Sequence, residues 1–171
     1  MENKFIHPSA VIEPGAKIAN DVIIGPLSYI GAEVTLRSGV EIKSHVVVTG
    51  KTEIEQDTVV YSFAVIGEIP QDLKFNGEKT SLKIGKRNQI RENVTINVGT
   101  AGGGGMTSVG NNCLFMTGSH IAHDAKIGDN VIIANCGAVA GHCVIEDDVI
   151  IGGLSGIHQF VRIGRGAIIG A

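Results

Sequence analysis

The sequence predicts an all-β chain wound as a parallel β-helix, and three observations lead to this prediction. An aliphatic residue returns at every sixth position along almost the whole chain. A small or β-branched residue precedes most of these by two positions, and residues two apart on a strand point to the same side. Gly, Asn and Asp gather between the pairs, where tight turns require them. A period of six fits neither an α-helix, with its period of 3.6, nor a half-buried strand, with its period of two.

The first series of aliphatic positions accounts for the N-terminal part of the chain. It runs without a gap through Ile6, Ile12, Ile18, Ile24, Ile30, Leu36, Ile42, Val48, Ile54, Val60 and Ile66. The spacing then resumes at Ile84, Ile90 and Ile96. We expect one short strand at each position, with the large and the small residue of each pair facing inward.

The second series accounts for the C-terminal part, after the count slips by one residue. Its members are Val109, Phe115, Ile121, Ile127, Ile133, Val139, Ile145, Ile151, Ile157, Ile163 and Ile169. Each inner residue is covered only by stacking on neighbouring coils, so stability is expected to be shared along the stack. Residues 1–171 are therefore predicted to form a single β-helix domain.

The repeat resembles that of the bacterial hexapeptide-repeat proteins. In that family three hexads close a triangular coil of 18 residues, and the coils wind with a left hand. The closure and the hand are implied by the resemblance, because the general rule for parallel strands favours right-handed crossovers. The expected fold class is thus a left-handed parallel β-helix of hexapeptide repeats.

Two interruptions of the repeat predict loops that leave the coils. Residues 67–83 separate Ile66 from Ile84, and residues 97–108 hold a second, shorter insertion. Insertions leave a solenoid at its turns and often build the binding face. The run Gly102–Gly105 is expected to be a flexible, solvated loop. It is not a phosphate-binding loop, because no Gly-Lys-Ser/Thr follows it.

Charge and composition narrow the classes of function. A net charge of −3 gives no general attraction to nucleic acid or to an anionic membrane. Residues 1–10 lack the apolar core of a secretory signal, and no run of 18 apolar residues predicts a membrane span. Cys113, Cys136 and Cys143 form no CxxC pair, so we expect reduced core thiols in a cytoplasmic protein.

Four of the six histidines are predicted to converge on one strip of the surface. Ile121, Val139 and Ile157 are 18 residues apart, so they lie on the same side of three successive coils. The four histidines lie within three residues of these positions and are His120, His123, His142 and His158. Adjacent coils are about 4.8 Å apart, the spacing of strands in a sheet. A shared functional cleft explains this convergence better than four separate structural roles.

Two chemistries suit this strip. A zinc site needs ligand nitrogens at about 2.0–2.1 Å in a tetrahedral array, whereas His123 and His158 lie roughly 10 Å apart at the backbone. A neighbouring subunit could supply the missing ligands. General-base catalysis needs one neutral imidazole near working pH, and the carboxylate of Asp124 could fix the tautomer of His123.

Several segments resemble the UDP-N-acetylglucosamine 3-O-acyltransferases that begin lipid A synthesis. The similarity extends over essentially the whole chain. Its most specific segments are Gln71-Asp72-Leu73-Lys74, His120-Ile121-Ala122-His123-Asp124, Val139-Ala140-Gly141-His142 and His158-Gln159-Phe160. The six-residue repeat alone would not identify this family, since many acyl- and acetyltransferases share it.

The resemblance implies a reaction and a set of residue roles. A (3R)-hydroxyacyl chain moves from acyl carrier protein to the 3-hydroxyl of UDP-GlcNAc. His123 matches the general base, Asp124 the residue that orients it, and the Gly141 N–H the oxyanion donor. The residues that match substrate contacts are Gln71, Asp72, Lys74, His120, His142, His158 and Gln159. The family uses no metal and no cofactor, and it works as a homotrimer with clefts between subunits.

The chain departs from this family at two points. Asn97 stands where well-known members carry histidine, and the chain ends at Ala171 within the repeat. The C-terminal helical domain of the family is therefore expected to be absent, and turnover by this length of chain to be low. Two other interpretations stay open, a hexapeptide-repeat zinc enzyme of the carbonic anhydrase type and a non-catalytic trimeric β-helix.

Overall fold

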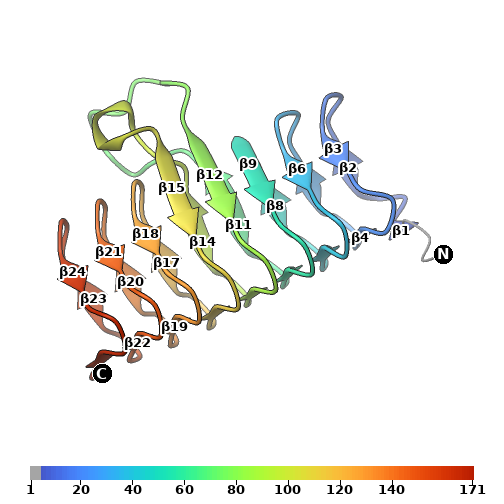
Figure 1. The fold of residues 1–171 in the computed structure, drawn as a ribbon. Coiled ribbons are helices and arrows are strands. Elements are labelled where there is room, and N and C mark those ends of the chain that lie inside the picture. The colour runs from blue at the N-terminus through green and yellow to red at the C-terminus, as the bar shows by residue number, and fades with distance from the viewer. Residues whose placement is uncertain (1–4) are drawn as a thin grey trace.

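The computed structural model describes residues 5–171 as a stack of coils built from short parallel strands (Figure 1). Each coil contributes one strand to each of three sheets, so neighbouring strands of a sheet come from successive coils. This arrangement confirms the predicted left-handed parallel β-helix with triangular coils. Residues 1–4, part of the segment expected to hold no secretory signal, lie outside the described residues.

The strands divide among the three sheets in a strict rotation. The first sheet contains β1 (Phe5–Ile6), β4 (Ile23–Ile24), β7 (Glu41–Ile42), β10 (Val59–Val60), β13 (Gln89–Ile90), β16 (Leu114–Phe115), β19 (Ile132–Ile133), β22 (Ile150–Ile151) and β25 (Ile168–Ile169). The second contains β2 (Val11–Ile12), β5 (Tyr29–Ile30), β8 (Val47–Val48), β11 (Val65–Glu68), β14 (Thr95–Asn97), β17 (His120–Ile121), β20 (Ala138–Val139) and β23 (Gly156–Ile157). The third contains β3 (Lys17–Ile18), β6 (Thr35–Leu36), β9 (Lys51–Ile54), β12 (Ser81–Ile84), β15 (Met106–Val109), β18 (Lys126–Ile127), β21 (Val144–Ile145) and β24 (Arg162–Ile163).

The pairing register follows the six-residue repeat. Ile12 pairs with Ile30 one coil later, and each aliphatic position pairs with the next one in its own sheet. The register survives both insertions, because Ile66 pairs with Ile96 and Ile96 pairs with Ile121. The inserted residues therefore leave the coil without shifting any inward side chain to the outer face.

The core is a continuous column of aliphatic side chains inside the coils. Phe115 is the largest fully buried side chain, and most of the aliphatic series is fully buried around it. Ile6, Ile12 and Ile169 are only partly buried, because coils at the two ends are covered on one side alone. The buried column supports the outer faces and corners, where the candidate site lies.

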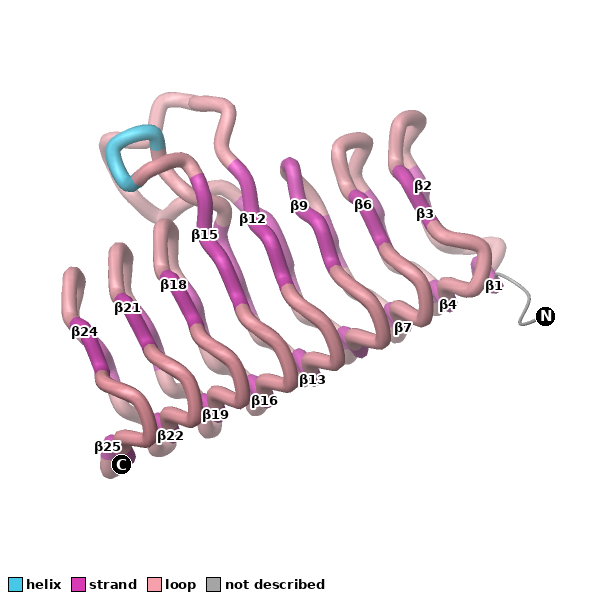
Figure 2. Tube along the Cα trace, in the orientation of Figure 1, coloured by secondary structure: helices cyan, strands magenta, loops and turns pink. Residues whose placement is uncertain are grey.

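Two loops project from the edge that joins the second and third sheets (Figure 1). The first occupies residues 69–80, between β11 and β12, and the second occupies residues 98–105, between β14 and β15. The second loop contains one short 3-10 helix, η1 (Ala101–Gly103), which is the cyan segment in Figure 2. The loops lie side by side over coils that are adjacent in the stack.

The structure also bears on the thiols and on membrane insertion. Cys113 and Cys143 are buried and free, as predicted for the small inward position. Cys136 is free but exposed, so the expectation that it is a core thiol is wrong; it occupies a corner with φ +57°. Within residues 5–171, no helix has the length and apolar character that crossing a membrane would require.

Candidate functional site

His123 and Asp124 form a buried pair at the corner between β17 and β18. His123 Nδ1 lies 2.9 Å from Asp124 Oδ2, which is a hydrogen-bond distance. His123 is 5% exposed, and the side chain of Asp124 is fully buried. Asp124 has a φ of +59°, a left-handed conformation that Asp adopts more readily than most residues. The sequence neighbours suspected of pairing are therefore in direct contact.

The second loop positions the carboxylate of Asp124. Thr100 donates to it twice, from its N–H to Oδ1 at 2.9 Å and from its hydroxyl to Oδ2 at 2.6 Å. The Thr100 hydroxyl also caps η1, because it accepts from the Gly103 N–H at 3.2 Å. Both oxygens of the carboxylate are thus held by one residue of the loop.

Glycine is required where this loop meets the carboxylate. A Cβ on Gly103 would lie 2.0 Å from Asp124 Cγ, and one on Gly99 would lie 2.8 Å from Asp124 Oδ1. The expectation that the Gly102–Gly105 loop is solvated agrees with the exposure of Gly102 and Gly104, whereas Gly103 packs against the carboxylate. The segment is a hydrogen-bonded turn whose backbone approaches a buried charge more closely than a side chain would allow.

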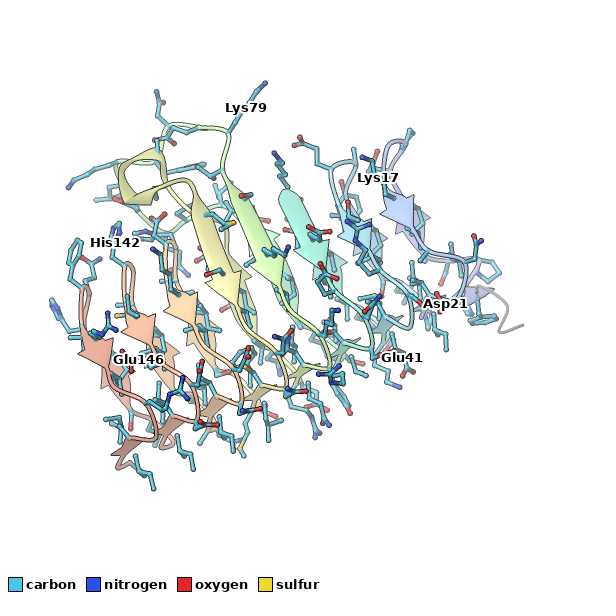
Figure 3. All side chains as sticks on the ribbon, viewed as in Figure 1. Lys17, Asp21, Glu41, Lys79, His142 and Glu146 are labelled. Carbon is cyan, nitrogen blue, oxygen red and sulfur yellow. The ribbon has the colours of Figure 1, made fainter. Side chains whose placement is uncertain are left out.

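His142 and Phe160 occupy the same corner in the next two coils. The φ angles of Asp124, His142 and Phe160 are +59°, +62° and +62°. The rings of His142 and Phe160 stack with centroids 4.5 Å apart, and the rings of His123 and His142 meet edge to face at 5.0 Å. His142 Nδ1 lies 3.8 Å from Asp124 Oδ2, the oxygen that His123 contacts. One carboxylate oxygen therefore faces two imidazoles, along the edge labelled by His142 in Figure 3.

Burial and hydrogen bonding shift the pKa of the Asp124 carboxyl in opposite directions. Burial raises the pKa of its carboxyl, but hydrogen bonds from the Thr100 hydroxyl and N–H and from His123 hold the pKa below its ordinary value. Burial lowers the pKa of His120, whose Nδ1 lies 2.7 Å from Thr95 Oγ1. At neutral pH, Asp124 is ionised and His120 is neutral.

A groove of about 450 Å³ lies on the outer face of the second sheet. The predicted site residues in its walls are Gln71, His120, His123, Gly141, His158 and Gln159. Small residues provide much of the remaining wall, namely Ala122, Ala138, Ala140 and Gly156. The groove therefore joins a strip of small side chains to a set of polar groups.

A second hollow of about 300 Å³ collects the other predicted residues. Its walls include Asp72, Lys74, Thr100, His142 and Phe160. Asp72 also has a local role, since its Oδ1 accepts from the Lys74 N–H at 3.0 Å. His123 borders the groove and His142 borders the hollow, and their rings are in contact. Asp124 lines neither space, because it lies beneath both imidazoles.

Comparison with known proteins agrees with the geometry. The bacterial transferase hexapeptide family (six repeats) matches residues 3–38 and 106–141. The acyl-[acyl-carrier-protein]–UDP-N-acetylglucosamine O-acyltransferase of Rhizobium johnstonii is 49% identical over 169 residues, which are 99% of this chain and 62% of the relative. This chain is a homologue of these O-acyltransferases.

Two further comparisons support the same assignment. The O-acyltransferase of Paracoccus denitrificans is 68% identical over 113 residues, 66% of this chain and 43% of the relative. The solved structure of LpxA from Acinetobacter baumannii superposes with a TM-score of 0.91 and 47% identity, covering 95% of this chain and 66% of that one. The chain spans less than two thirds of the length of the curated relatives it matches.

In this O-acyltransferase homologue, Gly141 lies against the ring of His123. A Cβ at Gly141 would lie 2.5 Å from His123 Cε1 and 2.7 Å from Nε2, so a side chain would displace the imidazole. Within residues 5–171 the Gly141 N–H has no hydrogen-bond acceptor. The N–H groups of His123 and Gln159, at equivalent positions of the adjacent coils, also have no acceptor among the described residues. An N–H without an acceptor therefore recurs at this position in three successive coils. Gly141 differs from the other two because it lies against the ring of His123.

Asn97, the residue at which the sequence was expected to depart from the family, anchors the first loop. Its Nδ2 donates to the carbonyl oxygens of Glu68 and Ile69 at 3.3 Å and 3.1 Å. Asn97 is 4% exposed and borders the groove, and its Oδ1 has no partner among the described residues. The side chain thus fixes the point where residues 69–80 leave the coil.

His123, Asp124 and His142 also form a group that could hold a metal ion, with one ligand atom of each within 4.8 Å of the others. Both oxygens of Asp124 already accept hydrogen bonds from Thr100, so a metal would compete with these donors for the carboxylate. His158 is outside this group, because it is exposed and its Nδ1 lies 3.3 Å from the Gln159 carbonyl oxygen.

The sequence analysis did not name Thr100 and Phe160 as site residues, although each carried a signal. Thr100 lies two residues before the glycine run, where a capping residue is favoured. Phe160 follows His142 by 18 residues, so the repeat places it at the same corner.

Proposed function

We propose that this chain carries the acyl-transfer site of a UDP-N-acetylglucosamine O-acyltransferase, with His123 as the general base. The main support is the buried His123–Asp124 pair. Nδ1 of the imidazole is held by the carboxylate, and Nε2 has no hydrogen-bond partner within residues 5–171. A neutral imidazole that donates through Nδ1 has its lone pair on Nε2. The names of the homologues supply the substrates, acyl carrier protein and UDP-GlcNAc.

In the proposed reaction, the sugar 3-hydroxyl attacks the carbonyl carbon of the (3R)-hydroxyacyl thioester. Nε2 of His123 takes the hydroxyl proton as the C–O bond forms, and the oxyanion accepts a hydrogen bond from the Gly141 N–H. When the C–S bond breaks, the imidazolium returns the proton to the leaving thiolate of the carrier. Asp124 remains ionised throughout and stabilises the imidazolium.

The two hollows divide the substrates between them in this proposal. The strip formed by Ala138, Ala140 and Gly156 suits an extended acyl chain, because it has no large side chains. Substrate contacts are assigned to Gln71, His120, His158 and Gln159 in the groove, and to Asp72, Lys74 and His142 in the hollow.

A second copy of the chain would complete the site. The groove opens to solvent on the outer face of a sheet, and exclusion of water strengthens charge stabilisation during the reaction. Leu73 and Ile69 are large exposed apolar residues on the first loop, as expected for a loop that contacts another subunit. We therefore include the homotrimer and the cytoplasmic location in the proposal.

A zinc-dependent activity is the second candidate, because His123, Asp124 and His142 place three ligand atoms close together. Metal analysis of the purified full-length protein separates the two candidates. Stoichiometric zinc together with CO2 hydration would favour the metal enzyme. Acyl transfer that persists in the presence of a chelator would favour the O-acyltransferase.

The substitution His123→Asn tests the general base. The amide NH2 of Asn can replace Nδ1–H as donor to Asp124, while the group that accepts the substrate proton is lost. Acyl transfer from hydroxyacyl carrier protein to UDP-GlcNAc should fall by about 10²–10⁴-fold. The thermal unfolding temperature should change little, since the buried hydrogen bond is retained.

His7→Asn is the matched control. His7 hydrogen-bonds Ser9 at an exposed turn of the first coil, far along the stack from the groove. The His7→Asn protein should transfer acyl groups at the wild-type rate. A His123→Asn protein that transfers acyl groups at the wild-type rate would show that the imidazole is not the base.

A further inference from the structure

The Asp124 carboxylate has two possible imidazole partners, and the structure shows which of them it contacts more closely. Oδ2 lies 2.9 Å from His123 Nδ1 and 3.8 Å from His142 Nδ1. Both nitrogens face the same oxygen, so the contact with His123 depends on a group that holds the carboxylate in its observed orientation.

Thr100 is the group that holds it. Its N–H donates to Oδ1 and its hydroxyl donates to Oδ2, so one residue hydrogen-bonds both oxygens. The same hydroxyl accepts from the Gly103 N–H, so it donates to the carboxylate while it accepts from the turn. Thr100 is 7% exposed, so water does not compete effectively for the carboxylate.

We propose that Thr100 is a positioning residue that directs Asp124 to His123 rather than to His142. This inference rests on the proposed role of His123 and adds a third member to the pair. With the carboxylate fixed, His123 donates through Nδ1 and keeps its lone pair on Nε2, the form that accepts the substrate proton. Thr100 lies beside the Asp124 carboxylate because the inserted glycine-rich turn places it there.

The glycines around Thr100 support this assignment independently. A Cβ at Gly103 would meet the Asp124 carboxylate alone, and a Cβ at Gly99 would meet the backbone of Gly105 and Met106 as well as Asp124 Oδ1. Gly102 faces open space, with nothing within 4 Å of an added Cβ. Close approach is thus restricted to the glycines that bring the two donors of Thr100 onto the carboxylate.

Thr100→Val in the full-length protein tests the proposal, because it removes the hydroxyl and keeps the shape of the side chain. We expect kcat to fall about 10- to 100-fold, as for loss of one hydrogen bond to a charged group. Nitrogen NMR of the His123 ring should show the Nδ1–H form in the wild-type protein and a mixture of tautomers in the variant. Thr100→Ser keeps the hydroxyl and should restore both properties.

Thr58→Val is the matched control. Thr58 is fully buried and its hydroxyl also bonds two backbone groups, the Gly85 carbonyl and the Asn88 N–H, but it is remote from His123. It should lower stability while leaving the His123 tautomer and kcat unchanged. If Thr100→Val unfolds, the smaller Thr100→Ala replaces it in the same measurements.

A wild-type tautomer of His123 in a folded Thr100→Val protein would overturn the proposal, as would an equal loss of kcat in the Ser and Val variants. The tautomer measurement needs no substrate. It therefore tests Thr100 even if the wild-type protein transfers no acyl group to UDP-GlcNAc, an outcome that would refute the proposed function alone.

Discussion

At the scale of single residues, the site depends on a few groups that are held in unusual environments. Asp124 is ionised although it is buried, because Thr100 and His123 together supply three hydrogen bonds. Counting by 18 from the sequence groups four histidines, of which His120, His123 and His158 line one groove, and His142 contacts the ring of His123 beside it. It could not find Thr100, since the inserted residues before Val109 break the count at that point.

Asp124→Asn should abolish the correct tautomer without straining the backbone, because Asn also tolerates the left-handed φ of +59° at this position. The amide NH2 would donate to His123 Nδ1 and leave the proton on Nε2. We expect the acyl-transfer rate to fall by about 10²-fold or more. Steady-state kinetics of the folded variant check this, and an unchanged rate would contradict it.

The effect of Asp124→Asn on the free energy of unfolding should depend on pH. Because the pKa of Asp124 is lowered in the folded protein, its ionised form stabilises the fold above the unfolded pKa of about 3.9. That contribution is lost as pH falls through the lower, folded pKa. The difference in unfolding free energy between wild type and Asp124→Asn should therefore be largest near neutral pH and shrink below about pH 4. Urea titrations at several pH values measure it, and a difference independent of pH would count against the assignment.

At the scale of elements, strands and loops differ in how well the sequence predicts them. Strand positions follow from the six-residue repeat, because each inward side chain must be aliphatic to fill the core. The conformation of the second loop did not follow, since glycine is compatible with both a mobile segment and a tight turn. Contact with Asp124, a residue in the following coil, defines the close approach at Gly103, and a single sequence does not reveal that contact.

Gly103→Ala tests the close approach of this loop. The added Cβ would overlap the Asp124 carboxylate, so the turn must move at a cost of about 1–3 kcal/mol. The thermal unfolding temperature should fall by several degrees, and the acyl-transfer rate should fall with it. Gly102→Ala is the control for stability, because its Cβ would meet no atom within 4 Å. Equal unfolding temperatures for the two variants would contradict the packing described here.

At the scale of the whole molecule, each coil is stabilised by the coils above and below it. The sequence predicts this stacking, although it does not reveal the left hand of the winding, which the resemblance to hexapeptide-repeat proteins supplied. The open groove on the second sheet is a surface that the described coils leave uncovered.

Phe115→Ala tests how far the effect of one coil extends. Removing the largest fully buried side chain should cost about 3–5 kcal/mol. Amide hydrogen exchange should accelerate in β13 and β19, the strands on either side of β16, while β1 and β4 remain protected. Phe115→Leu should cost only about 1.5 kcal/mol or less, because the rest of the series is aliphatic. Uniform acceleration along the chain would indicate a single cooperative unit instead.

The stacked corner of Asp124, His142 and Phe160 means that separate rungs contribute separate chemical groups. Inserting one complete coil between the coil of Asp124 and the coil of His142 would give every sheet an extra strand and leave the aliphatic interior intact. It would also shift His142 away from the carboxylate by about 4.8 Å, one strand spacing. A scaffold of this kind can therefore change the reach of its catalytic groups in fixed steps while its architecture stays the same.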